Sequence, residues 1–116
     1  YRADKLGKMG FSISSIEISN NDGWCDDPNN KLYNQFVKFP FESSAEKLYR
    51  TDDLYDIICV MNYNTDPVLP GKGSAIFLHV CGNNFAPTEG CVSVEKKVLI
   101  EVSKQITDES TIIIEG

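Results

Sequence analysis

The chain has 116 residues, with 11 basic and 17 acidic side chains and a formal net charge of −6. This length supports one domain with a single hydrophobic core. The acidic balance and the absence of a Lys/Arg cluster argue against a nucleic-acid surface, and no apolar run has membrane-spanning length or the pattern of a signal peptide.

The first half of the chain predicts a strand, a polar loop and a short helix. Apolar residues alternate imperfectly from Phe11 to Ile18, which predicts a strand with a bulge, and the turn residues Asn20 to Gly23 end it. The segment Trp24 to Asn34 has the composition of a loop, where binding side chains tend to lie, but the residues alone favour a plain surface turn. Ser43 is expected to cap a short packing helix that ends near Thr51.

The second half predicts two neighbouring strands, a helix and a last strand. Leu54 to Tyr63 is apolar on both faces, which predicts a central strand, and Ser74 to Val80 forms its neighbour. Ser93 is expected to cap a helix from Glu95 to about Ile106, and Thr111 to Glu115 reads as a strand. The apolar face of this helix is predicted to comprise Val98, Leu99, Val102 and Ile106. The fold class is therefore mainly β with two helices.

The chain's one histidine, His79, ends an apolar strand, and Cys91 follows twelve positions later, at the far end of a loop. A neighbouring imidazole can take the proton of a thiol and generate a nucleophile. Gly90 allows a sharp turn that aims its own N–H and that of Cys91 at a developing oxyanion. A helix beginning soon after Cys91 would also favour the thiolate. The residues alone fit equally well a strand with a satisfied histidine and a small buried cysteine.

The four cysteines are Cys25, Cys59, Cys81 and Cys91, and no two are spaced as Cys-x-x-Cys. This is a poor disulfide framework and a poor zinc motif, so no metal site is predicted, although His79 with Cys81, Cys91 and Cys25 is a less favoured alternative. Cys59 reads as a small buried hydrophobe. Cys81 points to the side of His79 if the strand continues, where it could oxidise with Cys91, but a position in a loop is favoured.

The run GSAIFLH, a short loop and then PTEGCVSV resemble the catalytic signature of the L,D-transpeptidase family, the YkuD-type domain. In that family a histidine is followed by Ser or Thr, a variable position, Gly and the nucleophilic Cys, and the matching positions are His79, Thr88, Gly90 and Cys91. Many members have a longer spacing and a histidine where this chain has Glu89. They also carry Arg and Asn after the cysteine, where this chain has Val-Ser-Val.

The shorter spacing and the PTEGC motif resemble a compact branch of this family, in which DGWCDDP, YN and DLYD segments also occur. They stand here at Asp22 to Pro28, Tyr33-Asn34 and Asp53 to Asp56, so the resemblance covers most of residues 22–116. It implies an L,D-transpeptidase-like β-sandwich or barrel, with residues 1–116 forming a single catalytic domain. Members usually have strand-forming sequence before such a start, so the first strands are expected to be missing.

The resemblance implies an enzyme that remodels bacterial peptidoglycan in the cell envelope. Cys91, deprotonated by His79, would attack a tetrapeptide stem, release D-alanine and pass the acyl group to another stem or to water, with Gly90 in the oxyanion hole. It also implies that no cofactor is needed and that carbapenems bind the cysteine covalently. The residues expected to bind substrate are Thr88, Glu89, Trp24, Asp26 and Tyr33.

Two alternatives from other classes of protein stay open. One is a non-catalytic relative that keeps the fold and binds a peptidoglycan stem. The other is a metal-binding domain built on the same His and Cys residues.

Overall fold

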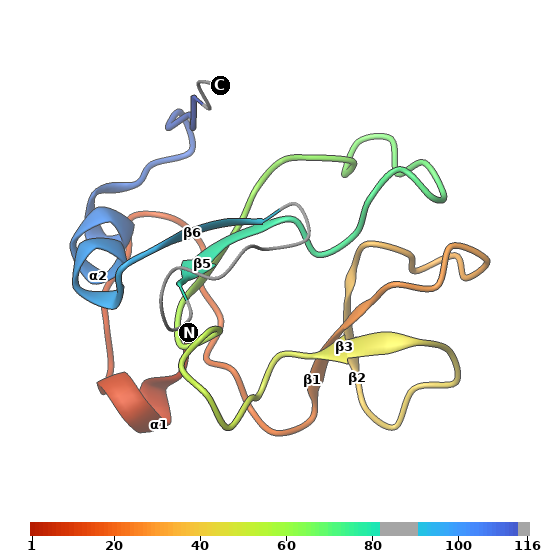
Figure 1. The fold of residues 1–116 in the computed structure, drawn as a ribbon, viewed down its shortest axis with the longest axis horizontal. Helices are drawn as coiled ribbons and strands as arrows, with labels where there is room; N and C mark the ends of the chain where they lie inside the picture. The colour runs from red at the N-terminus through yellow and green to blue at the C-terminus, as the bar shows by residue number, and fades with distance from the viewer. Residues whose placement is uncertain (82–90, 114–116) are drawn as a thin grey trace.

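The computed structural model describes residues 1–81 and 91–113, in which two helices flank six short strands (Figure 1). The strands form two three-stranded sheets, ordered β2-β1-β3 and β4-β5-β6. The prediction of a mainly β domain with two helices is confirmed. The elements in chain order are α1 (Ala3–Leu6), β1 (Asp22–Cys25), β2 (Phe36–Lys38), β3 (Ala45–Lys47), β4 (Ile58–Val60), β5 (Phe77–Val80), β6 (Val92–Val94) and α2 (Lys96–Gln105).

The first sheet is antiparallel, with β1 in its centre and all four β1 residues buried. The sequence predicted a turn up to Gly23 and a loop from Trp24, and both predictions are wrong at β1. Gly23 belongs to a strand because it pairs with Val37 on one side and Lys47 on the other. The ring of Phe39 covers it, and a Cβ there would lie 2.6 Å from a Phe39 ring carbon. The carboxylate of Asp22 accepts the Ser19 N–H at 2.8 Å, so the polar turn residues hold the entry to the strand.

The helix predicted from Ser43 to Thr51 is also wrong, because β3 forms there. Ala45 pairs with Cys25 and Lys47 with Gly23, so this segment takes its backbone hydrogen bonds from β1 rather than from a helical turn. Tertiary pairing overrides a weak local preference for helix. The Ser43 hydroxyl accepts a hydrogen bond from the Asn30 side chain at 2.9 Å instead of capping a helix.

Residues 11–18 form no strand, contrary to the sequence prediction. They pass over the core as an extended strap, in which the N–H of Ile18 donates to the carbonyl of Tyr1 at 2.7 Å. The Tyr1 ammonium donates to the Ile16 carbonyl at 2.8 Å. Of the alternating apolar residues, Ile18 is buried in the core, whereas Ile16 is 59% exposed, and the segment joins no sheet.

The second sheet brings together the two long apolar segments, as predicted, but the strands are shorter than predicted: β4 covers only Ile58–Val60, and β5 begins at Phe77 rather than at Ser74. β4 runs antiparallel to β5, with Ile58 opposite His79, and β6 runs parallel to β5, with Ser93 opposite His79. The prediction that β4 is central is wrong, because β4 lies at the edge of the described sheet and Val60 is 53% exposed.

The helix predicted after Cys91 exists as α2, but its start and its buried face differ from the prediction. Ser93 is in β6 rather than at a cap, and α2 begins at Lys96. Leu99 and Ser103 are the buried residues, whereas Val98 and Val102 are 48% and 39% exposed. Leu99, which the apolar pattern did select, packs on Leu78 and Val80 of the sheet, whereas the burial of Ser103 was not predicted.

The predicted last strand is also wrong in its described part. Residues Thr111 to Ile113 form no strand and are exposed, and positions 114 and 115 lie outside the described residues. Within the described residues, neither helix has the length and apolar character to cross a membrane.

Two apolar clusters lie on the two faces of β5, because successive strand residues point to opposite sides. The first contains Phe77 with Trp24 and Tyr55, and Cys91 packs against it. The second contains Leu78, Val80 and Leu99 of α2. In Figure 1, β5 and β6 accordingly lie between α2 and the first sheet.

A fully buried carboxylate ties α1 and α2 to the core. Asp56 lies 2.7 Å from Lys5 Nζ and 2.7 Å from Lys96 Nζ, and its carbonyl accepts the Arg2 N–H at 2.8 Å. The helices α1 and α2 are thus joined through Asp56, just before β4.

Candidate active site

His79 lies in β5 and is 5% exposed. Its Nδ1 is 2.7 Å from the carbonyl oxygen of Val80, which can only accept a hydrogen bond. The Nδ1 atom therefore carries the proton, and in the neutral ring Nε2 has the free lone pair. A backbone carbonyl thus orients this imidazole, and it leaves Nε2 as the atom that can accept a proton.

Tyr55 holds the imidazole from one side. The two rings meet edge to face with centroids 5.5 Å apart, and the Tyr55 hydroxyl donates to the Glu46 carboxylate. Burial, together with the hydrogen bond to Glu46 and its charge, raises the pKa of Tyr55 well above its ordinary value. Tyr55 therefore stays a neutral phenol at neutral and mildly alkaline pH.

Cys91 directly precedes β6, and its side chain contacts the backbone before and within β5. The thiol donates to the Ala75 carbonyl at 3.0 Å, and the Phe77 N–H donates to the sulfur at 3.3 Å. Burial raises the pKa of Cys91; the Phe77 N–H acts to lower it and the Glu46 charge to raise it further. The expectation that α2 would favour the thiolate is wrong, because β6 lies between them and this environment favours the protonated thiol.

Cys91 and His79 lie on the same face of the second sheet. Leu78 pairs with Val92 and His79 with Ser93, so Cys91 is the diagonal neighbour of His79 on the adjacent strand. Diagonal neighbours on adjacent strands lie about 7–8 Å apart. The cluster around Phe77 and Tyr55 contains the sulfur and packs on the imidazole, and Cys91 keeps partial exposure. The register thus places Cys91, just before β6, and His79 of β5 on one face of the sheet.

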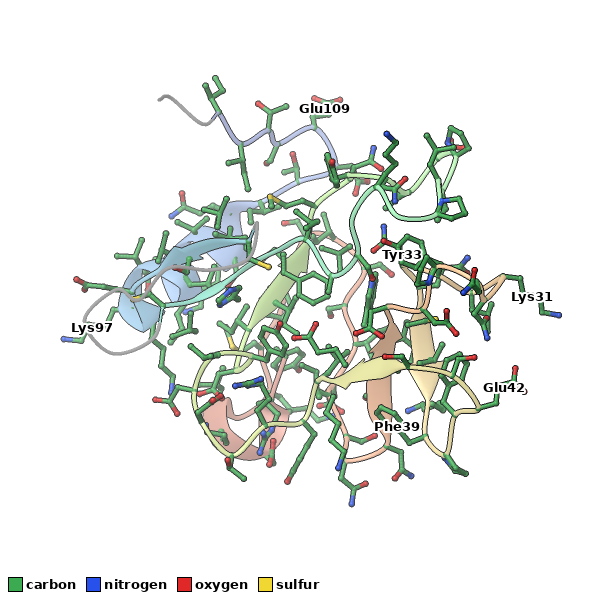
Figure 2. The ribbon with its side chains drawn as sticks, turned by 45° about the vertical axis from the view of Figure 1, so that its right-hand side comes forward. Lys31, Tyr33, Phe39, Glu42, Lys97 and Glu109 are labelled. Carbon is green, nitrogen blue, oxygen red and sulfur yellow. The ribbon has the colours of Figure 1, made fainter. Side chains whose placement is uncertain are left out.

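Two of the predicted binding residues are buried and contact β5 or the loop that leads to it. Trp24 is buried and packs edge to face on Phe77, with centroids 5.1 Å apart. Tyr33 is buried too, and its hydroxyl accepts the Gly73 N–H at 3.2 Å; Figure 2 shows Tyr33 beside the loop that leads to β5. Asp26 is exposed and its N–H donates to the Ser44 carbonyl at 3.2 Å, so it lies at the surface of the first sheet. Thr88, Glu89 and Gly90 lie outside the described residues.

Three contributors to the site were not assigned a role from the sequence. Asn34 accepts hydrogen bonds from Trp24 Nε1 at 2.9 Å and from the Ala75 N–H at 3.1 Å. Asn34 belongs to the YN motif at Tyr33-Asn34, and Tyr55 belongs to the DLYD motif at Asp53 to Asp56. These two motifs were the sequence features that could have pointed to them. Ala75 gave none, because nothing in the sequence marks an alanine with a left-handed backbone.

Cys81 follows the end of β5, and its N–H donates to the carbonyl of Val94 in β6 at 2.8 Å. It lines a polar pocket of about 780 Å³ at the carboxyl end of β5. The four cysteines, all described, are thiols rather than disulfides, and no three His, Cys, Asp or Glu residues in the described parts of the chain are grouped as metal ligands. The polar pocket is lined by Asp52, Asp53, Leu54, Val80, Cys81, Glu95, Lys96 and Lys97.

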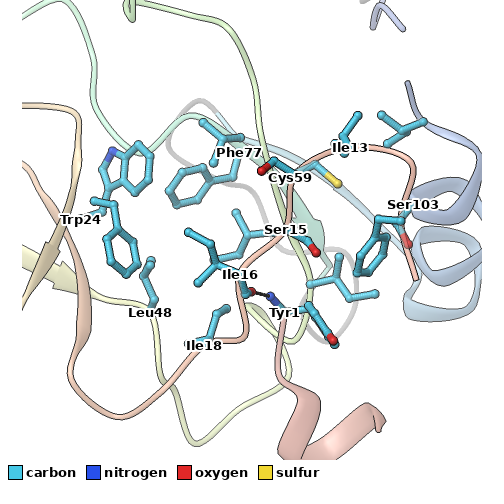
Figure 3. A pocket seen from close by; sticks show the side chains of 17 residues that line it. Tyr1, Ile13, Ser15, Ile16, Ile18, Trp24, Leu48, Cys59, Phe77 and Ser103 are labelled. Atoms are coloured by element: carbon cyan, nitrogen blue, oxygen red, sulfur yellow. Dashed lines mark hydrogen bonds between the residues drawn. The ribbon is translucent and has the colours of Figure 1, made fainter. Parts of the chain in front are cut away.

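An apolar cavity of about 410 Å³, lined in part by Phe77, lies under the strap of residues 11–18 (Figure 3). Trp24 and Leu48 border one end, and Tyr1 and Ser103 border the other. This cavity separates the strap from the edge strand β4, whose three residues also line it.

These features place a cysteine and a histidine on one face of a sheet in a mainly β domain. The family model of the L,D-transpeptidase catalytic domain, YkuD, matches residues 8–114, and the chain belongs to this family. Its members act on peptidoglycan peptide stems. No curated protein and no solved structure matches the chain.

Proposed function

We propose that this protein is a peptidoglycan L,D-transpeptidase with Cys91 as nucleophile and His79 as general base. One observation carries the proposal: the two side chains share one face of β5 and its neighbour, and Val80 holds Nδ1 so that Nε2 can accept a proton. Membership of the YkuD family supports the same assignment.

The reaction has two acyl-transfer steps. The proton of the Cys91 thiol passes to His79 Nε2 as the sulfur attacks the carbonyl carbon of the third, L-centred residue of a tetrapeptide stem. The C–N bond to the terminal D-alanine breaks, and the departing amine takes the proton from His79. The amine of a diamino acid in a second stem then attacks the thioester, loses a proton through His79 and restores the thiol, which leaves a 3-to-3 cross-link.

Water can replace the second stem in the last step. Its attack on the thioester releases a tripeptide stem, and the enzyme then acts as an L,D-carboxypeptidase. Both acceptors use the same acyl-enzyme, so Cys91 and His79 are needed for either product.

The environment of the thiol indicates how the nucleophile forms. Burial raises the pKa of Cys91, so the resting site holds a neutral thiol. The proton then moves to His79 during attack, as in general-base catalysis, rather than before substrate binds. The same raised pKa is the observation that favours the second candidate, a non-catalytic relative that binds a stem without reacting.

The other predicted site residues have roles in this proposal. The N–H groups of Gly90 and Cys91 hold the oxyanion, an effect of about 3 kcal/mol for each donor. Thr88 and Glu89 shape that loop, and Trp24, Asp26 and Tyr33 are assigned to substrate binding or to support of the site. Residues 1–116 are proposed to form one catalytic domain that works outside the cytoplasmic membrane, in the bacterial cell envelope.

A carbapenem tests the function because its strained lactam carbonyl accepts a thiol and leaves a stable covalent adduct. We expect one adduct per chain by intact-protein mass spectrometry, absent in Cys91→Ala, retained in Cys81→Ala and formed more slowly in His79→Ala. Purified tetrapeptide stems should then yield free D-alanine. A folded wild-type protein that forms neither adduct nor D-alanine would support the binding relative, and stoichiometric zinc in the native mass would support the metal-binding alternative.

A further inference from the structure

Three residues other than glycine have left-handed backbone conformations in the described parts of the chain, and they meet at one point. They are Asn34 with φ 60°, Asn64 with φ 53° and Ala75 with φ 57°. Asparagine adopts this conformation readily, whereas alanine does so only at a cost in energy. Ala75 is therefore strained, and such strain persists only where the surroundings impose it.

The side chain of Asn34 is what imposes it. Its Oδ1 accepts the Ala75 N–H at 3.1 Å, and its Nδ2 donates to the carbonyls of Tyr63 at 3.2 Å and Asn64 at 2.7 Å. Asn34 is only 4% exposed, and Trp24 Nε1 donates to the same Oδ1 at 2.9 Å. The amide group thus uses both its acceptor and its donors to connect three separate segments.

The strained alanine in turn holds the nucleophile. The carbonyl of Ala75 accepts the hydrogen bond from the Cys91 thiol at 3.0 Å. The chain before this carbonyl is fixed, since Ser74 Oγ donates to the Cys25 carbonyl at 2.8 Å and the Asn64 side chain donates to the Gly73 carbonyl at 2.9 Å. After it, the Ile76 carbonyl accepts the Met61 N–H at 3.3 Å. The direction of the Ala75 carbonyl is therefore set by contacts that extend to the first sheet.

We propose that Asn34 is a positioning residue for Cys91: it fixes Ala75 so that the Ala75 carbonyl holds the thiol in one place and in its protonated form until substrate arrives. The inference rests on the proposed function in taking Cys91 as the nucleophile. A carbonyl oxygen accepts from S–H but faces a thiolate lone pair with its own, so this contact favours the protonated sulfur. Burial and the Glu46 charge raise the pKa of Cys91 in the same direction.

The first test measures the thiol itself. The rate of Cys91 alkylation by iodoacetamide, followed by peptide mass spectrometry across pH, gives the midpoint at which the thiolate forms. In Asn34→Ala we expect this midpoint to fall by roughly half a pH unit or more, because the thiol loses a fixed acceptor. Carbapenem acylation is expected to slow about tenfold in the same variant, because the sulfur is no longer aimed.

The matched control is Val37→Ala, which removes buried side-chain atoms in β2, outside both apolar clusters. It should lower the melting temperature and leave the alkylation midpoint of Cys91 unchanged. An unchanged midpoint in Asn34→Ala, or an equal shift in Val37→Ala, would overturn the assignment of Asn34.

A second measurement needs no Asn34 variant and so covers the case in which Asn34→Ala does not fold. The Raman difference between wild type and Cys91→Ala isolates the S–H band of this thiol. We expect it at a lower wavenumber than the band of a thiol in apolar solvent, as a hydrogen bond to Ala75 requires, and a band at the apolar position contradicts the proposal. Neither measurement of the thiol depends on turnover. If the thiol results are as expected but the carbapenem does not react, the proposed function is refuted and the role of Asn34 is not.

Discussion

The Tyr55 ring packs edge to face on the His79 imidazole, with centroids 5.5 Å apart, and its hydroxyl donates to Glu46. The same ring also contacts Phe77, with centroids 5.7 Å apart. The orientation of the proposed base is therefore fixed by two groups, the Val80 carbonyl on Nδ1 and the Tyr55 ring on its side.

Substitution of Tyr55 separates the ring contact from the hydroxyl. Tyr55→Phe keeps the edge-to-face contact, which is worth about 1 kcal/mol, whereas Tyr55→Leu removes it. We expect carbapenem acylation to slow about fivefold in Tyr55→Leu and by less in Tyr55→Phe, measured as second-order rates. Equal rates in both variants and wild type would show that the ring does not orient His79.

Alkaline pH is expected to destabilise the protein through Tyr55 and Cys91. Burial raises the pKa of Tyr55 above 10.0 and that of Cys91 above 9.0, so the folded state keeps protons that the unfolded chain releases. Their contribution to stability is present below pH 9 and is lost as pH rises through the folded values.

The slope for Tyr55 is about 1.4 kcal/mol of unfolding free energy per pH unit above pH 10, since this side chain is well buried. Urea unfolding at intervals from pH 8 to 11 measures it. The Tyr55→Phe variant should show a shallower decline above pH 10 and Cys91→Ala a shallower decline above pH 9. Parallel curves for all three proteins would contradict the assignment.

Lys96 is expected to stabilise the fold through the buried Asp56 carboxylate. Lys96→Met leaves Asp56 with Lys5 as its remaining described ion-pair partner, and we expect a loss of about 2 kcal/mol, because an inadequately paired buried charge is costly and the lysine is partly exposed. Lys104→Met, on the same helix, breaks a 4.0 Å surface pair with Glu101 and should cost under about 0.5 kcal/mol. Chemical denaturation of the two variants gives the comparison, and equal losses would refute it.

Gly23 is expected to tolerate no side chain. In Gly23→Ala the new Cβ would lie 2.6 Å from the Phe39 ring and 3.2 Å from the Glu46 carbonyl oxygen, inside β1. We expect a loss of about 1–3 kcal/mol, as is usual for overpacking. Gly10→Ala is the control, since a Cβ there meets nothing within 4 Å, and its melting temperature should match or exceed that of the wild type. A normal melting temperature for Gly23→Ala would show that Phe39 yields.

The sequence predicted the elements whose pattern is strong over many residues. The strand ending at His79, its antiparallel neighbour and the helix after Cys91 were all found. It failed where three or four residues take their structure from a distant partner, as β3 does from β1, and at residues 11–18 and 111–113, which form no strand. Segments this short carry too few residues for propensity to decide between helix and strand.

The pairing of His79 with Cys91 on one face followed from the family pattern and agrees with the register of the parallel strands. The protonation of the thiol did not follow, because it depends on burial and on the Ala75 carbonyl. The roles of Asn34 and Tyr55 were equally out of reach, since each contacts segments distant in the chain.

Trp24 is the single tryptophan of the chain, and it lies against Phe77 with its indole N–H bonded to Asn34. Intrinsic fluorescence excited at the red edge therefore originates from one place, next to the segment that holds the sulfur. Acylation of Cys91 should change the emission wavelength or intensity of this indole, so the protein carries its own optical reporter of acyl-enzyme formation and can be followed in a stopped-flow instrument without a label.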